Sequence, residues 1–292
     1  MPITPATSGP ECSPIRIRHG GPAASPVVLR KEAVRLARRV GQLEDTLHQV
    51  ELARDTNARL LDRIMAELEV ERARSRDLLL NILPQPIIDR LNAGEQLIAD
   101  RYDDVAVVFS DFVGFTEISA RTPVATVVSS LNEMFSRFDT ACADFGVEKI
   151  KTIGDAYMAA AGMPGLSVAG SSTDANGEAQ SGHIHAAAGL ALAMLAVVDD
   201  MGPPWRLRIG IHNGPVVAGV IGTSKFVYDL WGDAVNVASR LEASSEPGRI
   251  QVSASVAAAL GDSFVLEPRG LIDLKGKGAT PTFFVTARPP TG

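Results

Sequence analysis

The amino-acid sequence predicts an α+β fold, one sheet with covering helices, preceded by a long coiled-coil helix. From Leu29 onward, apolar residues recur in alternating steps of four and three. Beyond Tyr102, short apolar runs alternate with helix-like segments without strict strand–helix–strand repetition. The predicted organisation is an irregular segment at 1–28, a coiled-coil helix at 29–77, a joint at 78–101, the folded domain at 102–287 and a tail at 288–292.

The coiled-coil prediction depends on a narrow apolar seam. The seam residues are Leu29, Ala33, Leu36, Val40, Leu43, Leu47 and Val50, followed after a gap by Leu61, Ile64 and Leu68. Arg54 and Asn57 occupy seam positions between them, where polar residues commonly fix register and oligomeric state. The alternative is a single amphipathic helix lying on its own domain, although such a helix usually has a broader apolar face. The six prolines of residues 1–28 exclude a regular element there.

The joint and the domain show a change of pattern. Pro84 and Pro86 interrupt the helix, and Ile87, Ile88 and Leu91 predict a short amphipathic helix after them. The predicted strands are 105–109, 147–151, 156–162, 206–211, 215–221 and 250–252, with short strands around 264–274 and 281–286. The predicted helices are 116–138, 183–199, 234–242 and 253–260, and the Ser-, Gly- and Ala-rich residues 165–182 predict a flexible loop.

Composition excludes several classes of protein. A net charge of -6 argues against non-specific nucleic-acid binding, because no basic excess is present to neutralise phosphates. The two cysteines, Cys12 and Cys142, lack metal-type spacing and suit a reducing compartment. Residues 1–28 lack the apolar core of a secretory signal, and the most apolar stretch, 186–198, is too short to span a bilayer. We therefore expect a cytoplasmic protein with no membrane span, unless a partner carries it to a membrane.

Two segments place an aspartate at the end of a strand. Asp111 follows the apolar run 105–109, and a turn with Gly114 leads into a helix near Thr116, where backbone N–H groups and a carboxylate can hold Mg²⁺ and phosphate. Asp155 stands at the tip of a Gly-Asp hairpin, and two such carboxylates can share a pair of metal ions. The plainer alternatives are that Asp111 caps the helix and that Gly-Asp is only a turn dipeptide.

Two further segments carry groups suited to a nucleotide. Asn236 and Arg240 are four residues apart and share one helical face, where an amide and a planar guanidinium can converge on a phosphate-bearing ligand. Such a pair can also be merely solvated. Leu274-Lys275-Gly276-Lys277-Gly278 places two lysines at a glycine-rich strand end that can reach a polyphosphate.

In this order, the four segments resemble the catalytic domain of the class III adenylyl and guanylyl cyclases, particularly the bacterial homodimeric ones. The likeness covers about residues 78 to 285, and Leu79-Leu80-Asn81-Ile82-Leu83-Pro84 resembles the linker that follows a signalling coiled coil in that family. The resemblance implies a ferredoxin-like βαββαβ core. It also implies a homodimer, formed through the catalytic domain and the coiled coil, whose active sites are shared between protomers.

The resemblance also implies a role for each matched residue. The metal-binding group is Asp111, Asp155 and the Phe112 carbonyl, with Gly114, Phe115 and Thr116 beside the phosphates. From the other protomer, Lys151 and Asp229 read the purine, Asn236 orients the ribose, Arg240 stabilises the transition state and Lys275 holds the terminal phosphates. Phe112 replaces the more usual Ile or Leu, which a backbone ligand tolerates.

The implied activity is conversion of ATP to 3′,5′-cyclic AMP and pyrophosphate with two divalent metal ions, Mg²⁺ or Mn²⁺. The related guanylyl enzymes carry Glu and Cys where this chain has Lys151 and Asp229, so a guanylyl cyclase is the alternative within the family. The alternative from another class is a non-catalytic nucleotide-binding or dimerisation module. An upstream sensor or regulatory partner can act through the coiled coil.

Overall fold

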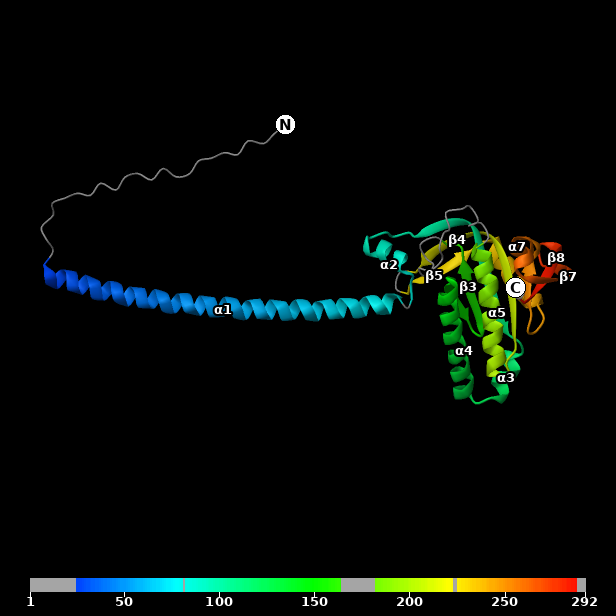
Figure 1. Cartoon of the computed structure of the whole chain (residues 1–292), viewed down its shortest axis with the longest axis horizontal. Helices are drawn as coiled ribbons and strands as arrows, with labels where there is room; N and C mark the ends of the chain where they lie inside the picture. The colour runs from blue at the N-terminus through cyan, green and yellow to red at the C-terminus, as the bar shows by residue number, and fades with distance from the viewer. Residues whose placement is uncertain (1–24, 81, 164–181, 223–224, 288–292) are drawn as a thin grey trace, which may run out of the picture. The chain divides into compact units, whose positions relative to one another are not determined.

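The long helix α1 runs without a break from Pro26 to Leu80, 55 residues, and extends three residues beyond the predicted range 29–77 at each end (Figure 1). None of its residues is buried, so the apolar seam is exposed in the single chain; Leu36 and Leu43 are 62% and 64% exposed. Exposed leucines at heptad spacing are what a helix needs to pair with another helix. The coiled coil itself stays a prediction.

The structure, a computed structural model, describes residues 25–80, 82–163, 182–222 and 225–287. The predicted loop at 165–182, apart from residue 182, and the predicted tail at 288–292 lie outside these ranges, as does nearly all of the segment 1–28. The chain divides between residues 74 and 75 into two units, which we describe separately.

The second unit is built on one eight-stranded sheet. Its strands are β1 (Ala99–Phe112), β2 (Glu148–Ile153), β3 (Ala156–Ala161), β4 (Leu207–Ile221), β5 (Val227–Trp231), β6 (Ile250–Ser253), β7 (Val265–Leu274) and β8 (Gly278–Ala287). Its helices are α2 (Gln85–Asn92), α3 (Phe115–Arg121), α4 (Val124–Phe145), α5 (Gly182–Met201), α6 (Asp233–Ser244), α7 (Ala254–Leu260) and a 3₁₀ turn, Gly261–Ser263. The strand order is β2-β3-β1-β4-β6-β8-β7, with β5 paired to β4.

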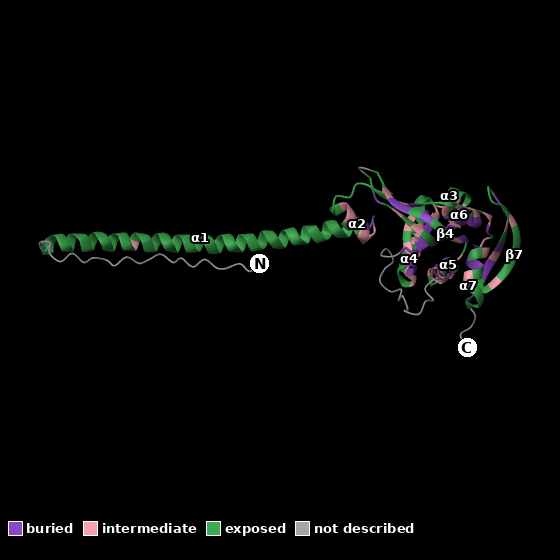
Figure 2. Cartoon of the chain, turned by 90° about the horizontal axis from the view of Figure 1, so that it is seen from above, coloured by how far each residue is buried: buried purple, intermediate pink, exposed green. Residues whose placement is uncertain are grey.

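Two hydrophobic clusters hold helices against the two faces of the sheet. In β1, Ala106 and Val108 belong to the cluster with α4, α5 and α7, whereas Val105 and Val107 belong to the cluster with α2 and α6. This alternation is the period-two pattern of a strand covered on both sides. Figure 2 shows the buried residues gathered in the centre of the sheet domain and the exposed surface of α1. The predicted α+β class is confirmed.

Three elements differ from the sequence prediction. The predicted helix 116–138 is two helices, because Pro123 ends α3 and starts α4, and α4 continues to Phe145. The predicted strands 206–211 and 215–221 form one strand, β4. Pro215 has no N–H to donate, but the register of β1 shifts opposite it, between Tyr102 and Val105, and the pairing with β1 continues on both sides. Strand β5 was not predicted at all.

The apolar helix α5 is a core helix. With 20 residues it is longer than the predicted stretch, and by length and composition it could cross a membrane. Ile184, Leu190 and Met194, however, are buried in the cluster that covers the sheet. The core helix of a folded domain satisfies the same test, and 44% of the apolar window of α5 is buried.

Candidate active site

The two aspartates predicted to bind metal lie together at the end of β1 and the β2–β3 turn. Gly154 has φ of +64°, the left-handed conformation that lets the hairpin turn tightly before Asp155. Burial raises the pKa of Asp155, and the adjacent Asp111 carboxylate raises it further. Two partly buried carboxylates that repel one another form a site that favours a bound cation, so the residues present fit the expected divalent metal.

Arg208 is a further member of this site that the sequence analysis missed. It stands directly opposite Asp111 in the β1–β4 register, and its Nη2 donates to Asp111 Oδ2 over 2.9 Å. Its Nε donates to Glu242 Oε1 over 2.6 Å. The Glu242 side chain is only 9% exposed, and burial raises its pKa to about 7 even though Arg208 lowers it. One guanidinium is therefore held between two carboxylates next to the metal-binding pair, a position from which it can also contact an anion.

Glu242 reaches Arg208 because α6 packs very closely on β4. A Cβ placed on Gly210 would lie 2.2 Å from the backbone nitrogen of Glu242, so only glycine fits there. The buried side of α6 carries Ala234, Ala238 and Glu242. The sequence signal for this contact is a glycine in a strand, which marks a close approach but does not name the partner.

The predicted purine-reading pair forms within one chain. Lys151 Nζ, at the end of β2, donates to Asp229 Oδ2, on β5, over 2.5 Å. The Asp229 side chain is 14% exposed and also accepts from the backbone N–H of Leu230 over 2.8 Å, which fixes its orientation. The pair thus offers one cationic donor and one carboxylate acceptor side by side, partly shielded from water.

Asn236 and Arg240 lie on the other side of α6 from Glu242. At about 100° per residue, Glu242 is about 120° around the helix from Asn236 and about 160° from Arg240. Asn236 is exposed, and its Nδ2 donates to the Gly232 carbonyl over 3.4 Å. The structure therefore brings Asp111 together with Asp155 and Lys151 together with Asp229, and it places Asn236 and Arg240 on the outer side of α6.

The turn after β1 and the turn before β8 complete the predicted set. Gly114, with φ of +71°, precedes α3, which begins at Phe115 and places Thr116 in its first turn. The Phe112 side chain is 1% exposed and packs on Trp205, so only its backbone can contact a ligand. Lys275 is exposed in the turn between β7 and β8.

The β7–β8 turn is tied to α6. Lys277 Nζ donates to Asp233 Oδ2, in the first turn of α6, over 2.5 Å. A Cβ placed on Gly276 would lie 3.8 Å from Arg240 Nη1, so the backbone of this turn passes beside the predicted transition-state residue. Lys275 and Arg240 consequently belong to the same group.

Comparison with known proteins identifies the family. Residues 97–287 match the model of the Adenylate and Guanylate cyclase catalytic domain, a range that contains every predicted site residue. The chain belongs to this cyclase family. The class III cyclase resemblance inferred from the four segments is thereby confirmed.

Relatives of this cyclase chain include enzymes of both substrate types. It is 43% identical over 231 residues to an adenylate cyclase of Mycobacterium tuberculosis, covering 77% of this chain and 49% of that protein. The chain thus spans about half the length of the curated relative it matches. Among solved structures it is similar to the guanylate cyclase domain of RhGC from Catenaria anguillulae in complex with GTP, with 36% identity and a TM-score of 0.57, covering 65% of this chain and 100% of that one. The adenylyl cyclase CyaB from P. aeruginosa has 27% identity and a TM-score of 0.57 and covers 66% of this chain and 99% of that one.

Proposed function

We propose that this cyclase converts ATP to 3′,5′-cyclic AMP and pyrophosphate. The observation that carries the proposal is the Lys151–Asp229 pair. Adenine presents a ring-nitrogen acceptor beside an exocyclic amine donor, and a lysine next to a carboxylate matches that pattern. Guanine presents N–H donors that call for a carboxylate acceptor, and Lys151 stands where the guanylyl relatives carry Glu. The M. tuberculosis relative, described as an adenylate cyclase, supports the same choice.

A guanylyl cyclase is the second candidate function. It is favoured by the structural similarity to the Catenaria anguillulae domain, which was solved with GTP. The polarity of the Lys151–Asp229 pair argues against it, because a guanine placed there would set N–H donors against an ammonium group. A non-catalytic module would explain neither the paired carboxylates nor the buried Arg208–Glu242 contact behind them.

Divalent metal ions are general cofactors of class III cyclase domains. In this chain Asp111 and Asp155, with the Phe112 carbonyl, would hold two Mg²⁺ or Mn²⁺ ions per site. Bound there, the ions supply Lewis-acid stabilisation of the ribose 3′ oxygen and of the triphosphate. A general-base role for Asp111 is not required.

The protein side chains position the substrate and stabilise charge. The ribose 3′ oxygen attacks the α-phosphorus and pyrophosphate leaves. Asn236 orients the ribose, Arg240 offsets the charge that builds on the α-phosphate, and Lys275 holds the terminal phosphates. Gly114, Phe115 and Thr116 provide backbone donors where helix α3 begins.

The two groups of site residues support sites shared by a homodimer. Within one chain one side of α6 carries Glu242, which contacts Arg208 of β4 beside Asp111, and the other side carries Asn236 and Arg240, so the metal-binding and transition-state residues face different directions. A two-fold dimer of catalytic domains brings the group of one protomer to the opposite group of its partner. Pairing of α1 through its seam would hold the two protomers in register and transmit a signal from an upstream partner. We expect this enzyme to act in the cytoplasm.

A product assay tests the proposed activity. The purified full chain is supplied with ATP or GTP, in Mg²⁺ and in Mn²⁺, and cyclic products are quantified by mass spectrometry. We expect cyclic AMP to exceed cyclic GMP under both metals and the Asp155→Ala variant to form neither. Preferential cyclic GMP formation would identify a guanylyl cyclase, and absence of both products with folded, dimeric protein would identify a non-catalytic module.

A further inference from the structure

The start of α1 carries an outer face unlike the rest of the helix. With Leu29, Ala33, Leu36 and Val40 on the seam, the positions that point away from a paired helix are the second, third and sixth of each heptad. Between residues 27 and 38 these positions hold three valines and three cations, which we call the valine–cation face: Val27, Val28, Lys31, Val34, Arg35 and Arg38. Pairing through the seam leaves this face accessible.

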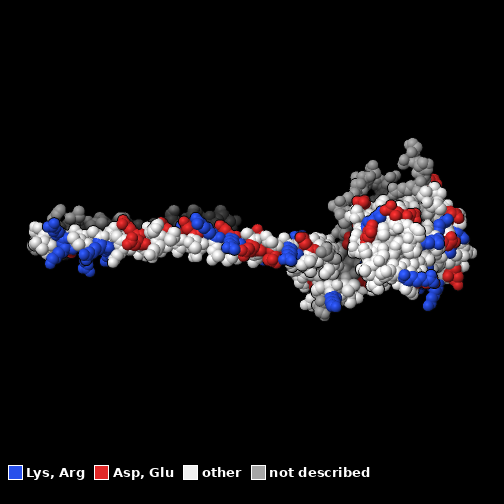
Figure 3. All heavy atoms as spheres, turned by 90° about the horizontal axis from the view of Figure 1, so that it is seen from below, with Lys and Arg blue, Asp and Glu red and all other residues white. Residues whose placement is uncertain are grey.

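Charge is segregated along this helix. Residues 26–43 contain five cations and a single carboxylate, Glu32, in a chain whose net charge is -6. In the described part of the chain, the ion pair within α1 is Arg63–Glu67, and none of the five cations takes part in one. Farther along, the same outer positions mix the carboxylates Asp45, Asp55, Asp62, Glu69 and Asp77 with the cations Arg59, Arg63 and Arg76. On the face that Figure 3 shows, basic atoms gather at the start of α1 and acidic atoms are concentrated farther along the helix.

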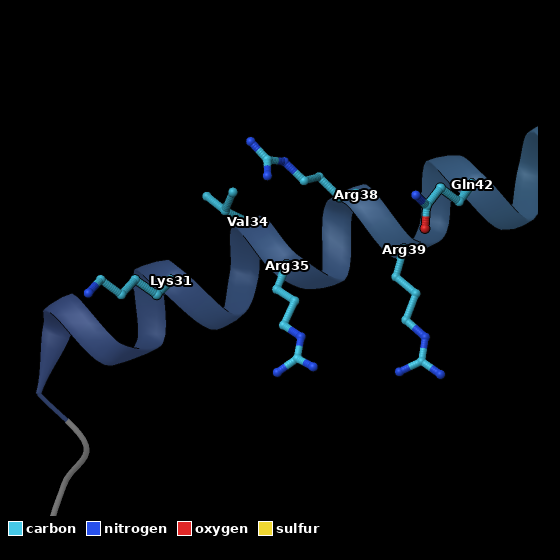
Figure 4. A pocket seen from close by; sticks show the side chains of 6 residues that line it. All are labelled: Lys31, Val34, Arg35, Arg38, Arg39 and Gln42. Atoms are coloured by element: carbon cyan, nitrogen blue, oxygen red, sulfur yellow. The ribbon is translucent and has the colours of Figure 1, made fainter.

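The side chains of this face project over a broad arc of the helix. In Figure 4, Val34 and Arg38 project on one side, Arg35 extends on another side next to Arg39, which is not part of the face, and Lys31 lies one turn before them. Val27, Val28 and Val34 are 63%, 49% and 52% exposed and lie off the seam. Exposed valines interleaved with unpaired cations have no role in a coiled coil, which needs polar residues at these positions.

We propose that the valine–cation face binds an anionic phospholipid surface. Lysine and arginine close to anionic headgroups are attracted electrostatically, and their aliphatic stems can lie along the acyl boundary while the charges stay at the headgroups. The valines between them enter that boundary, as in helices that lie in the membrane interface. Charge complementarity selects an anionic occupant. The face has no aromatic, asparagine or serine side chain that could stack on or read bases, which disfavours nucleic acid.

Vesicle co-sedimentation tests this surface. The full chain is mixed with vesicles of phosphatidylcholine alone or of phosphatidylcholine and phosphatidylglycerol, with no nucleotide present, so the result is independent of cyclase activity. We expect binding to the anionic vesicles only, weakening as salt is raised. The variant Lys31→Gln/Arg35→Gln/Arg38→Gln should lose roughly 100-fold in affinity, because three charge contributions are removed together.

A matched variant on the same helix separates the face from general charge. Arg59→Gln/Arg63→Gln removes two outer cations that are interleaved with carboxylates, and we expect its vesicle binding to equal that of the unchanged chain. Circular dichroism and sedimentation check that helix and dimer persist in both variants, since glutamine is a good helix former and the seam is untouched. Equal binding by the two variants, equal binding to neutral vesicles, or no binding to anionic vesicles would overturn the proposal. Binding to duplex DNA or to an acidic protein in place of vesicles would also overturn it.

Discussion

Lys151 Nζ donates to Asp229 Oδ2 over 2.5 Å, and this contact joins β2 to β5 across 78 residues of chain. Each side chain holds the other in a fixed position at the place where a purine is expected to bind. Because the donor and the acceptor are held as a unit, base preference should depend on the pair rather than on either residue alone.

Exchanging this pair should change the preferred base. We expect Lys151→Glu combined with Asp229→Cys to lower ATP turnover and to raise relative GTP turnover at least about tenfold, because the hydrogen-bond polarity toward the purine is reversed. The ratio of kcat/KM for the two nucleotides is the measurement. The neighbouring Lys149–Asp139 pair, 2.7 Å apart, provides the control: the corresponding exchange there should leave the ratio unchanged. An unaltered ATP preference in a well-folded Lys151/Asp229 double variant would refute the assignment.

Removing charge from Asp155 should have opposite effects on activity and stability. The pKa of Asp155 is raised by burial and by Asp111, so the ionised carboxylate is disfavoured in the metal-free fold. We expect Asp155→Asn to abolish turnover and, without metal, to raise the melting temperature by about 2–4 °C. Scanning calorimetry in chelator, together with a turnover assay, measures both. A variant that is inactive because it is destabilised would contradict this account.

Glu242 should act on the metal site through Arg208. Glu242→Gln weakens the hold on Arg208, whose guanidinium can then pair more fully with Asp111 and compete with a cation there. We expect the Mn²⁺ concentration for half-maximal activity to rise roughly tenfold, as for other groups that support metal ligands. The exposed Glu267, paired with Arg249, is the control, and Glu267→Gln should leave metal dependence unchanged. An equal metal requirement in wild type and Glu242→Gln would rule out this coupling.

Glu148 should make stability depend on pH. Burial raises its pKa from 4.5 to about 7. Since the folded-state pKa is the higher one, the contribution of Glu148 to stability is fully present below about pH 4.5 and is lost as pH rises through about 7. The free energy of unfolding of Glu148→Gln, measured with denaturant, should therefore rise relative to that of wild type by on the order of 2 kcal/mol as pH increases from about 5 to about 8. The exposed Glu133→Gln should show no such pH-dependent difference.

The sequence predicted the parts of this molecule that depend on local pattern. The seam from Leu29, the joint at Pro84 and the Gly154-Asp155 turn are visible because helix periodicity, proline and glycine act on their own neighbourhood. Strand β5 was missed because its five residues, Val227–Trp231, are stabilised by pairing with β4 rather than by their own pattern.

The site was predicted less completely for the same reason. Asp111 was found from its place after a buried strand, whereas Lys151 and Asp229 were found through the resemblance to a family. Arg208 and Glu242, which are 34 residues apart, meet only because the β1–β4 register and the close packing of α6 on Gly210 bring them together. The only local signal, a glycine within the strand, marks a close approach at Gly210 but does not name the partner.

Complementation between two inactive variants tests the shared-site account most directly. Asp155→Ala and Asn236→Ala homodimers should each be nearly inactive, because every site carries one defect. Co-expressed, they form heterodimers in which one site has both defects and the other has none. With free pairing, activity should recover to roughly a quarter of wild type.

Mixing Asp111→Ala with Asp155→Ala is the matched control, and it should give no recovery because both residues belong to the same half of the site. The measurement is the rate of cyclic AMP formation by each mixture, with heterodimers verified by differential tags. The account predicts about a quarter of wild-type activity for the first mixture and none for the second. An inactive first mixture with heterodimers present, or equal recovery in both, would contradict sites shared across the dimer.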